Sequence, residues 1–441
     1  MSHRDRLIQR FASRNARVAV VGLGYVGLPT VRCFHDAGFS VIGFDIDRAK
    51  IDALRAGRAY LKHLGEDWVR SLAASPRFRP TDQPADLAEA DAVILCVPTP
   101  LGAHREPDLT FVERSTEMVA GVIQPGRLVV LTSTSYPGTT REVCLPILQK
   151  RGLTLGDDLF LCFSPEREDP GRAGVTTKSI PRLLGGLDPA STAVGLALFA
   201  PAVERVIPTD TAEIAEAAKL LENIYRAVNI ALVNELKPTL AAMGIDIWKV
   251  IDAAATKPYG FQPFYPGPGL GGHCIPIDPF YLTWKAREVQ ESTRFIELAG
   301  EINAHMPARV AEAVARALSD AGKPLRDADV LVIGLAYKPN IDDVRETPAL
   351  EIISILQDRG AKVSYHDPHV PTYPRMRKYE PQPLRSQPLT RERLAACDCV
   401  LIVTNHDGID YDLIGSAAPL VVDTRNAMAR VVSPAARIVK A

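Results

Sequence analysis

A glycine-rich stretch that leads into a cysteine is the part of the chain best suited to covalent chemistry. Residues 266–278 read PGPGLGGHCIPID, and the four glycines among residues 266–272 exclude a regular helix or strand and leave bare backbone for a ligand to approach. The apolar run that follows predicts a helix from about Ile275, with Pro276 in its first turn. Cys274 at that helix start would have a lowered thiol pKa and react as a thiolate, with Asp278 one turn away on the same face. The alternative is a small buried cysteine in a glycine-rich turn.

A second motif, near the N-terminus, predicts a dinucleotide site. An apolar strand over residues 17–21 runs into GLGYVG at residues 22–27, and a helical pattern, a strand over residues 40–44 and Asp45 follow. In this order the glycines form a tight turn, admit a pyrophosphate and allow close helix packing, while the acid binds a ribose diol. Asp45 would repel a 2′-phosphate, so NAD is predicted rather than NADP, and Lys50 is either a cofactor contact or a solvated surface charge. The predicted contacts of this motif are Gly22, Gly24, Tyr25, Val26, Gly27, Asp45 and Lys50.

The elements that must position these motifs alternate between strand and helix at both ends of the chain. In the N-terminal part Thr99, Thr134 and Glu166 each follow a predicted strand, which places them at the ligand-binding edge of a parallel sheet. Each of the three alone is more typical of a turn or a helix cap, but together they outline one crevice. Residues 211–243 predict one long helix, with Lys219 and Asn223 four residues apart on one face.

Helices continue to residue 321, and strand–helix alternation resumes near residue 330. There the sequence GLAY at residues 334–337 lacks the GxGxxG glycines, so this part binds a different nucleotide or is a structural relic. The predicted fold is α/β, with two doubly wound Rossmann-like domains joined by a central all-helical domain with one long helix. The predicted boundaries are residues 1–208, 209–321 and 322–441.

Composition restricts the class of protein further. The chain has 441 residues, a hydrophobic content of 46% and a formal net charge of −1, which argue for a globular protein without nucleic acid or an anionic membrane as its main partner. No apolar run is long enough to span a membrane, and the polar N-terminus lacks a signal peptide. Seven cysteines without a paired framework favour a cytoplasmic protein with reduced thiols. His366 and His369 lack a third ligand, so no metal site is expected.

Five segments together resemble the UDP-glucose/GDP-mannose dehydrogenase family: GLGYVG at residues 22–27, STSYPGT at 133–139, SPE at 164–166, AKLLEN at 218–223 and GGHCIPID at 271–278. The resemblance covers nearly the whole chain, and the cysteine motif is specific. The sequence EREDPG after Ser164-Pro165 and the segment of residues 264–278 resemble most the sequences of the family branch that oxidises UDP-N-acetylglucosamine.

The resemblance implies a four-electron oxidation of a UDP-sugar alcohol to the acid, with two NAD reduced in succession, in the supply of surface-polysaccharide precursors. Cys274 would capture the intermediate aldehyde as a thiohemiacetal, which becomes a thioester and is hydrolysed. The implied roles are oxyanion stabilisation by Lys219 and Asn223, proton transfer by Asp278 and ordering of the hydrolytic water by Glu166 and Thr134. Further implied contacts are Thr99, Thr134 and Arg345 to the cofactor, and Glu166, Arg167, Lys219, Asn223, Tyr265, Gly271, Lys338 and Arg425 to the substrate.

The chain departs from the family pattern at three places. Ile277 stands where much of the family has lysine, Arg167-Glu168 where many members have Phe-Leu, and Pro170 where the family has a second acid. These departures concern cofactor contacts rather than the reaction.

Three hypotheses follow: a UDP-N-acetylhexosamine dehydrogenase, the same chemistry on UDP-glucose or UDP-N-acetylmannosamine, and a catalytically silent NAD- and nucleotide-sugar-binding protein. The apolar long helix and the pairing of family members through this region also predict a homodimer or a higher homo-oligomer.

Overall fold

The computed structural model describes residues 1–61, 64–102, 105–167, 178–272, 274–373 and 382–441. By its internal contacts the chain forms two compact units, Met1–Glu222 with Phe280–Ser292, and Asn223–Pro279 with Thr293–Ala441. Helices α8 (Ala212–Ala242) and α10 (Asp278–Ala286) each contribute residues to both units. The division into three domains at residues 208 and 321 remains a prediction.

Unit 1 is built on an eight-stranded sheet with the order β3-β2-β1-β4-β5-β6-β7-β8. All neighbouring pairs are parallel except β6 and β7. The first six positions have the 3-2-1-4-5-6 order of dinucleotide-binding folds. The strands are β1 (Arg17–Val21), β2 (Ser40–Phe44), β3 (Phe78–Thr81), β4 (Ala92–Leu95), β5 (Arg127–Leu131), β6 (Leu159–Phe163), β7 (Arg182–Gly186) and β8 (Val206–Pro208).

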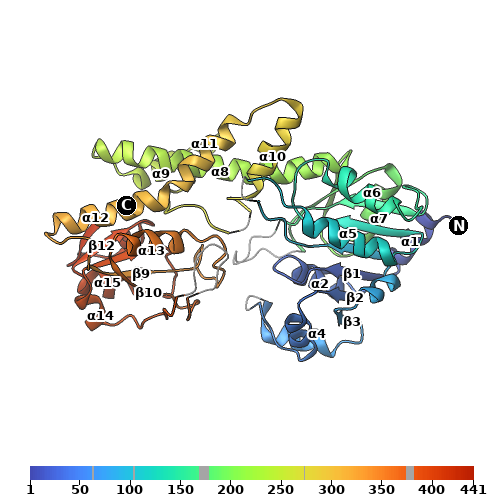
Figure 1. Ribbon diagram of the computed structural model, residues 1–441, viewed down its shortest axis with the longest axis horizontal. Coiled ribbons are helices and arrows are strands. Elements are labelled where there is room, and N and C mark those ends of the chain that lie inside the picture. Colours follow the sequence, from blue (N-terminus) through green and yellow to red (C-terminus); the bar gives the residue numbers. More distant parts are fainter. Residues whose placement is uncertain (62–63, 103–104, 168–177, 273, 374–381) are drawn as a thin grey trace. The chain divides into compact units, whose positions relative to one another are not determined.

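Helices cover both faces of this sheet (Figure 1). Alternate residues of β1 enter different cores: Val18 and Val20 pack with α1, α2 and α7, whereas Ala19 and Val21 pack with α5 and α6. Because both faces are buried, every strand from β1 to β6 except β3 is almost continuously apolar. The helices are α1 (His3–Ala12), α2 (Gly27–Asp36), α3 (Arg48–Arg55), α4 (Glu66–Ala74), α5 (Thr110–Val122), α6 (Leu145–Gln149) and α7 (Pro189–Phe199).

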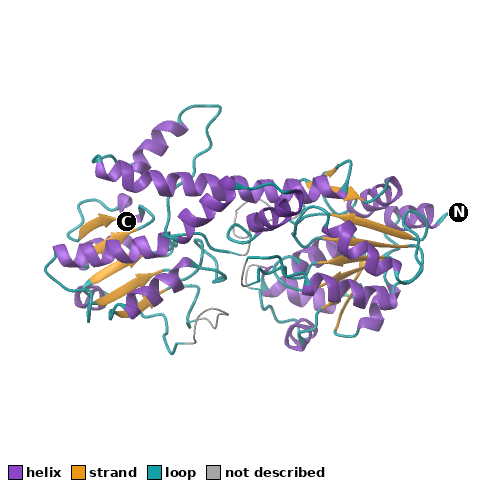
Figure 2. Cartoon of the chain, turned by 45° about the horizontal axis from the view of Figure 1, so that its top comes forward, coloured by secondary structure: helices purple, strands orange, loops and turns teal. Residues whose placement is uncertain are grey.

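Unit 2 contains an all-parallel five-stranded sheet with the order β10-β9-β11-β12-β13. In Figure 2 its strands are again flanked by helices; α12 and α13 pack on one face, and α14 and α15 on the other. The elements are α9 (Ile247–Ala255), α11 (Arg294–Ala304), α12 (Met306–Asp320), β9 (Asp329–Ile333), α13 (Pro348–Asp358), β10 (Lys362–His366), α14 (Arg391–Ala396), β11 (Cys399–Ile402), α15 (Tyr411–Ala417), β12 (Leu420–Asp423) and β13 (Arg437–Lys440).

The predicted fold class is confirmed, and the long helix predicted over residues 211–243 is α8. No helix in the described part of the chain is long and apolar enough to cross a membrane. One helix start differs from its prediction: α10 begins at Asp278 rather than near Ile275. The N–H groups of Ile277 and Asp278 both donate to the carbonyl of Cys274, at 3.2 and 2.8 Å, so residues 274–277 form a turn ahead of the regular helix.

Candidate active site

The three glycines of the N-terminal turn have three different environments. Gly22 has φ of +89°, and a Cβ there would lie 2.5 Å from the carbonyl oxygen of Cys96. A Cβ on Gly27, the first residue of α2, would lie 1.7 Å from the carbonyl oxygen of Gly22. A Cβ on Gly24 would meet no atom within 4 Å. The fold therefore requires the first and third glycines, whereas the second leaves space for a pyrophosphate to approach the turn.

Asp45 lies directly after β2 and is buried against this turn. Its Oδ2 accepts hydrogen bonds from the backbone N–H of Leu23 at 2.8 Å and from Lys50 Nζ at 2.9 Å, and its Oδ1 accepts from the N–H of Asp47 at 2.9 Å. Lys50 therefore pairs with Asp45 and is not only a solvated surface charge. The open Gly24 and a carboxylate at the end of the second strand fit the pyrophosphate and ribose of a dinucleotide such as NAD.

Thr99 and Thr134, predicted at neighbouring strand ends, come together beyond β4 and β5. Thr99 Oγ1 donates to the carbonyl oxygen of Thr134 at 2.7 Å, and Tyr281 Oη donates to the carbonyl oxygen of Thr99. Ser133 Oγ bridges the same two strand ends through the N–H and carbonyl of Val97, at 3.0 and 2.7 Å.

Glu216, which the sequence reasoning missed, fixes the turn that follows Thr134. Its carboxylate accepts from the N–H of Gly138 at 2.6 Å and from the N–H and hydroxyl of Thr140 at 3.0 and 2.6 Å. Burial raises the pKa of Glu216 to about 7, although these hydrogen bonds oppose the shift. Its position three residues before Lys219 on α8 is the only sequence signal that pointed to it.

Glu166 lies in a charged network beyond β6. Arg182, only 5% exposed, donates to Glu166 Oε2 at 3.1 Å and to Ser164 Oγ at 2.8 Å. Arg167 makes an ion pair with Glu222 at 2.5 Å. The predictions included Glu166 and Arg167 but missed Arg182, because it lies 16 residues from Glu166 in the sequence. Glu168 and Pro170 lie outside the described residues.

Lys219 and Asn223 lie one turn apart on α8, and both are buried, with 8% and 3% exposure. Asn223 belongs to unit 2, where its Nδ2 donates to Asp278 Oδ2 at 2.7 Å. The structure thus brings together two predicted catalytic residues that are 55 positions apart in the sequence. A buried carboxylate held by an amide donor is suited to proton transfer because its position is fixed.

Cys274 is exposed, which contradicts the alternative of a small buried cysteine. Of the seven cysteines, all within the described residues, it is the only exposed one. Burial raises the pKa of the Cys96 and Cys144 thiols to about 12, so those thiols are unreactive. His273, the neighbour of Cys274 in the motif, lies outside the described residues.

The loop before Cys274 packs closely on the segment between β9 and α13. A Cβ on Gly271 would lie 2.5 Å from Tyr337 Cβ, and the N–H of Gly272, whose φ is +79°, donates to the carbonyl of Arg345 at 2.9 Å. The glycines are therefore needed for backbone approach as well as for turning the chain. Tyr265, in the same loop, is exposed and donates to Asp252 at 2.7 Å.

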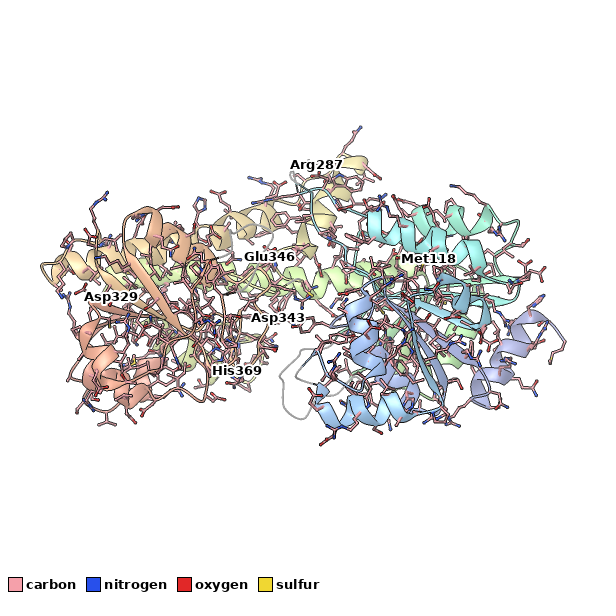
Figure 3. The ribbon with its side chains drawn as sticks, turned by 60° about the horizontal axis from the view of Figure 1, so that its bottom comes forward. Met118, Arg287, Asp329, Asp343, Glu346 and His369 are labelled. Carbon is pink, nitrogen blue, oxygen red and sulfur yellow. The ribbon has the colours of Figure 1, made fainter. Side chains whose placement is uncertain are left out.

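The remaining predicted contacts lie at the strand ends of unit 2. Arg345 makes an ion pair with Asp343 at 2.7 Å, in the segment where Figure 3 labels Asp343 and Glu346. Lys338 Nζ lies 5.9 Å from the ring centroid of Tyr337. Arg425 follows β12, and its Nε donates to the carbonyl of Val403 at 2.8 Å. The roles predicted for these residues are not tested by this geometry.

The second glycine turn, after β9, differs from the first in how its acid is used. Asp367 occupies the place of Asp45, at the end of the neighbouring strand, but it is completely enclosed. Its carboxylate accepts from the backbone N–H groups of residues 335, 336, 369 and 370 and from His406 Nε2 at 3.1 Å. The hydrogen bond from His406 and those from the backbone N–H groups of Ala336 and Leu335 lower the pKa of Asp367 to about 2 against the opposing effect of burial. This carboxylate holds its own turn together and is not available to a ribose.

Three family models match successive parts of the chain. They are the NAD-binding domain, the central domain and the UDP-binding domain of the UDP-glucose/GDP-mannose dehydrogenase family, over residues 16–203, 213–305 and 331–430. The UDP-N-acetyl-D-glucosamine 6-dehydrogenase of Pseudomonas aeruginosa is 36% identical over 368 residues, which are 83% of this chain and 86% of that protein. The UDP-N-acetyl-D-mannosamine dehydrogenase of Pyrococcus horikoshii is 33% identical over 93% of this chain and 95% of its own.

Solved structures agree with these matches. The structure of the UDP-D-ManNAc dehydrogenase from Pyrococcus horikoshii has a TM-score of 0.85 at 32% identity, covering 96% of this chain and 98% of that one. A UDP-glucose dehydrogenase from Pyrobaculum islandicum has a TM-score of 0.81 at 26% identity, covering 94% and 96%. With its fitting dinucleotide turn and its glycine-cysteine loop, the chain belongs to the UDP-glucose/GDP-mannose dehydrogenase family of NAD-dependent oxidoreductases.

Proposed function

We propose that this protein oxidises the C6 hydroxymethyl group of a UDP-N-acetylhexosamine to the carboxylic acid, with UDP-N-acetylglucosamine as the first candidate substrate. The observation that carries the proposal is the exposed Cys274, which follows a tightly packed glycine loop and begins the turn that leads to Asp278. An accessible thiol on fixed backbone is the arrangement that covalent capture of an aldehyde requires.

The reaction removes four electrons from the sugar in two oxidations and consumes one water. NAD, when bound at the N-terminal glycine turn and Asp45, accepts two electrons in each oxidation. After the first oxidation the Cys274 sulfur adds to the aldehyde carbon, and the new C–S bond gives a thiohemiacetal. The second oxidation leaves a thioester, and water breaks its C–S bond to release the acid and the thiol.

The other proposed roles follow from charge and hydrogen-bonding capacity. Lys219 carries a buried ammonium that suits an alkoxide or oxyanion, and Asn223 adds a neutral donor. Asp278 moves protons while Asn223 fixes its orientation. Glu166, held by Arg182, orders the hydrolytic water with Thr134. Substrate contacts are proposed for Arg167, Tyr265, Gly271, Lys338 and Arg425.

The identity of the sugar is the finer part of the proposal. The EREDPG sequence favours UDP-N-acetylglucosamine, and one relative is named for its action on that sugar. Another relative and one structural neighbour are named for UDP-N-acetylmannosamine, which favours that sugar instead. A UDP-sugar panel with NAD, followed by NADH absorbance, tests both. Two NADH per UDP-N-acetylglucosamine are expected. A rate that is higher for UDP-N-acetylmannosamine or UDP-glucose would reassign the substrate, and no NADH with any sugar would favour a silent binding protein.

We also propose that the protein is at least a dimer. Apolar side chains stay exposed on α8, among them Leu221 at 65%, Leu232 at 50% and Leu236 at 40%. An apolar surface of this kind is typical of an interface between subunits. Light scattering at micromolar concentration should give a mass well above the 48.0 kDa of one chain, and a mass equal to one chain would contradict the proposal.

A further inference from the structure

Lys237, on α8 within unit 2, is a buried cation that none of the proposed catalytic steps uses. Its side chain is 8% exposed, and its Nζ has no hydrogen-bond partner among the residues that the structure describes. An ammonium removed from water without an acceptor is strongly unfavourable, so a buried lysine in this state points to a missing partner.

Lys237 has other cationic side chains near it, whereas the carboxylates near it already accept hydrogen bonds from other groups. Its Nζ lies 5.0 Å from the ring centroid of Trp248, and Lys440 Nζ lies 5.2 Å from the same centroid. Burial lowers the pKa of Lys237 to about 8; Asp423 opposes this shift, whereas Arg425 and Lys440 add to it. A cation over an indole ring is only partly compensated, because the ring supplies no hydrogen-bond acceptor.

The two carboxylates near this cluster are already engaged. Asp423 is fully buried and accepts from the backbone N–H groups of Arg425 and Met428, at 2.9 and 2.8 Å. Asp246 accepts from Lys440 Nζ at 2.6 Å. Neither carboxylate hydrogen-bonds Lys237, and none of the described residues supplies an acceptor for its ammonium.

The glycine loop reaches the same place. The N–H of Gly267 donates to Asn234 Oδ1 at 3.0 Å, and Asn234 precedes Lys237 by one turn of α8. A Cβ on Gly267 would lie 2.7 Å from Arg425 Nη1, so the loop backbone and the guanidinium are close neighbours. Lys237, Arg425 and the bare backbone of the loop thus converge within unit 2.

We propose that Lys237 joins Arg425, already proposed above as a substrate contact, and binds the diphosphate of the UDP-sugar. This inference rests on the proposed function and extends it to a residue of α8, which lies outside the matched UDP-binding domain. Phosphoryl oxygens supply both the negative charge and the acceptors that the buried ammonium lacks. A bound anion also raises the pKa of Lys237, so binding near pH 8.5 takes up a proton.

The test is calorimetric titration with UDP of the full-length protein, comparing wild type with Lys237→Met and Lys237→Gln. Titrations at pH 8.5 in two buffers of different ionisation enthalpy measure the proton uptake. Wild type should take up a fraction of a proton per UDP. Both variants should take up none and should bind UDP about tenfold more weakly or worse. Uridine, measured by competition with UDP, should bind the variants and wild type equally, because it has no diphosphate.

Two controls separate this inference from folding defects and from the proposed function. Lys150→Met removes an exposed lysine of unit 1 and should leave UDP binding unchanged, and NAD affinity should be unchanged in all variants. Wild-type UDP affinity in Lys237→Met, or no proton uptake by wild type, would overturn the inference and leave Lys237 as a structural partner of Trp248. An equal loss of uridine affinity would reject the diphosphate assignment. Wild type that binds no UDP would overturn the proposed function as well.

Discussion

A matched pair of glycine substitutions tests the cofactor turn directly. Gly24→Ala adds a methyl group where no atom lies within 4 Å, and the backbone of Gly24 is outside the left-handed region, so the free protein should keep its stability within about 0.5 kcal/mol. Gly27→Ala adds the same methyl group 1.7 Å from a backbone oxygen, so the turn must open. The expected loss in the free energy of unfolding is about 3 kcal/mol, at the upper end of overpacking effects.

The variant that keeps its stability, Gly24→Ala, should be the one that loses affinity for NAD. If the pyrophosphate approaches Gly24, the methyl group of Gly24→Ala should weaken NAD binding by about 100-fold, or roughly 2.7 kcal/mol, although the protein keeps its native stability. Denaturant unfolding and NAD titration measure the two quantities on the same samples. Unchanged NAD affinity in Gly24→Ala would show that no pyrophosphate lies against this turn, and unchanged stability of Gly27→Ala would show that the turn relaxes freely.

Three further predictions concern Asp45, Cys274 and Lys237. NAD should be preferred over NADP in kcat/KM, and Asp45→Asn should narrow the preference because Lys50 then lacks its carboxylate; equal wild-type values would show that Asp45 does not face the ribose. Cys274→Ser should bind NAD and UDP-sugar but lose acid formation by several orders of magnitude, since serine is far less acidic than a thiol; a near-normal kcat would refute covalent catalysis by Cys274. Without UDP, burial lowers the pKa of Lys237 from its ordinary value of 10.5 to about 8. Between these two pH values the unfolded chain therefore binds more protons than the folded chain. The free energy of unfolding should therefore rise with pH across this window by up to about 3 kcal/mol, and a Lys237→Met variant whose denaturation shows the same rise would assign it to another group.

The two glycine turns show how one topology serves two purposes. In each, a glycine with φ near +90° leaves a strand and an acid ends the neighbouring strand. Asp45 shares its Oδ2 between one backbone N–H and a lysine, whereas both oxygens of Asp367 are saturated by its own turn and His406. The GLAY sequence left open whether the second turn binds a nucleotide or is only structural. For the acid of this turn, Asp367, the hydrogen bonds indicate a structural role.

The sequence alone determined the local elements of this protein. Apolar strands that end in GLGYVG and Asp45, and the glycine-free helical run that became α8, depend on periodicity and on the conformational needs of glycine, which act over a few residues. The motif around Cys274 was also recognisable from the sequence, because glycines and a proline next to a cysteine predict a turn with a reactive thiol without any tertiary contact. The sequence alone did not determine the exact start of α10, because that start depends on two N–H groups that share the carbonyl of Cys274.

Only the tertiary structure decided which charges meet. Arg182 reaches Glu166 because β6 and β7 are neighbours, and Asn223 reaches Asp278 because the glycine loop returns to α8. Lys237 looked like any lysine on a helix, which usually extends its ammonium to solvent. Its burial beside Trp248 and Arg425 results from chain segments far apart in the sequence packing together, and burial sets the free energy of a charge more strongly than any local pattern.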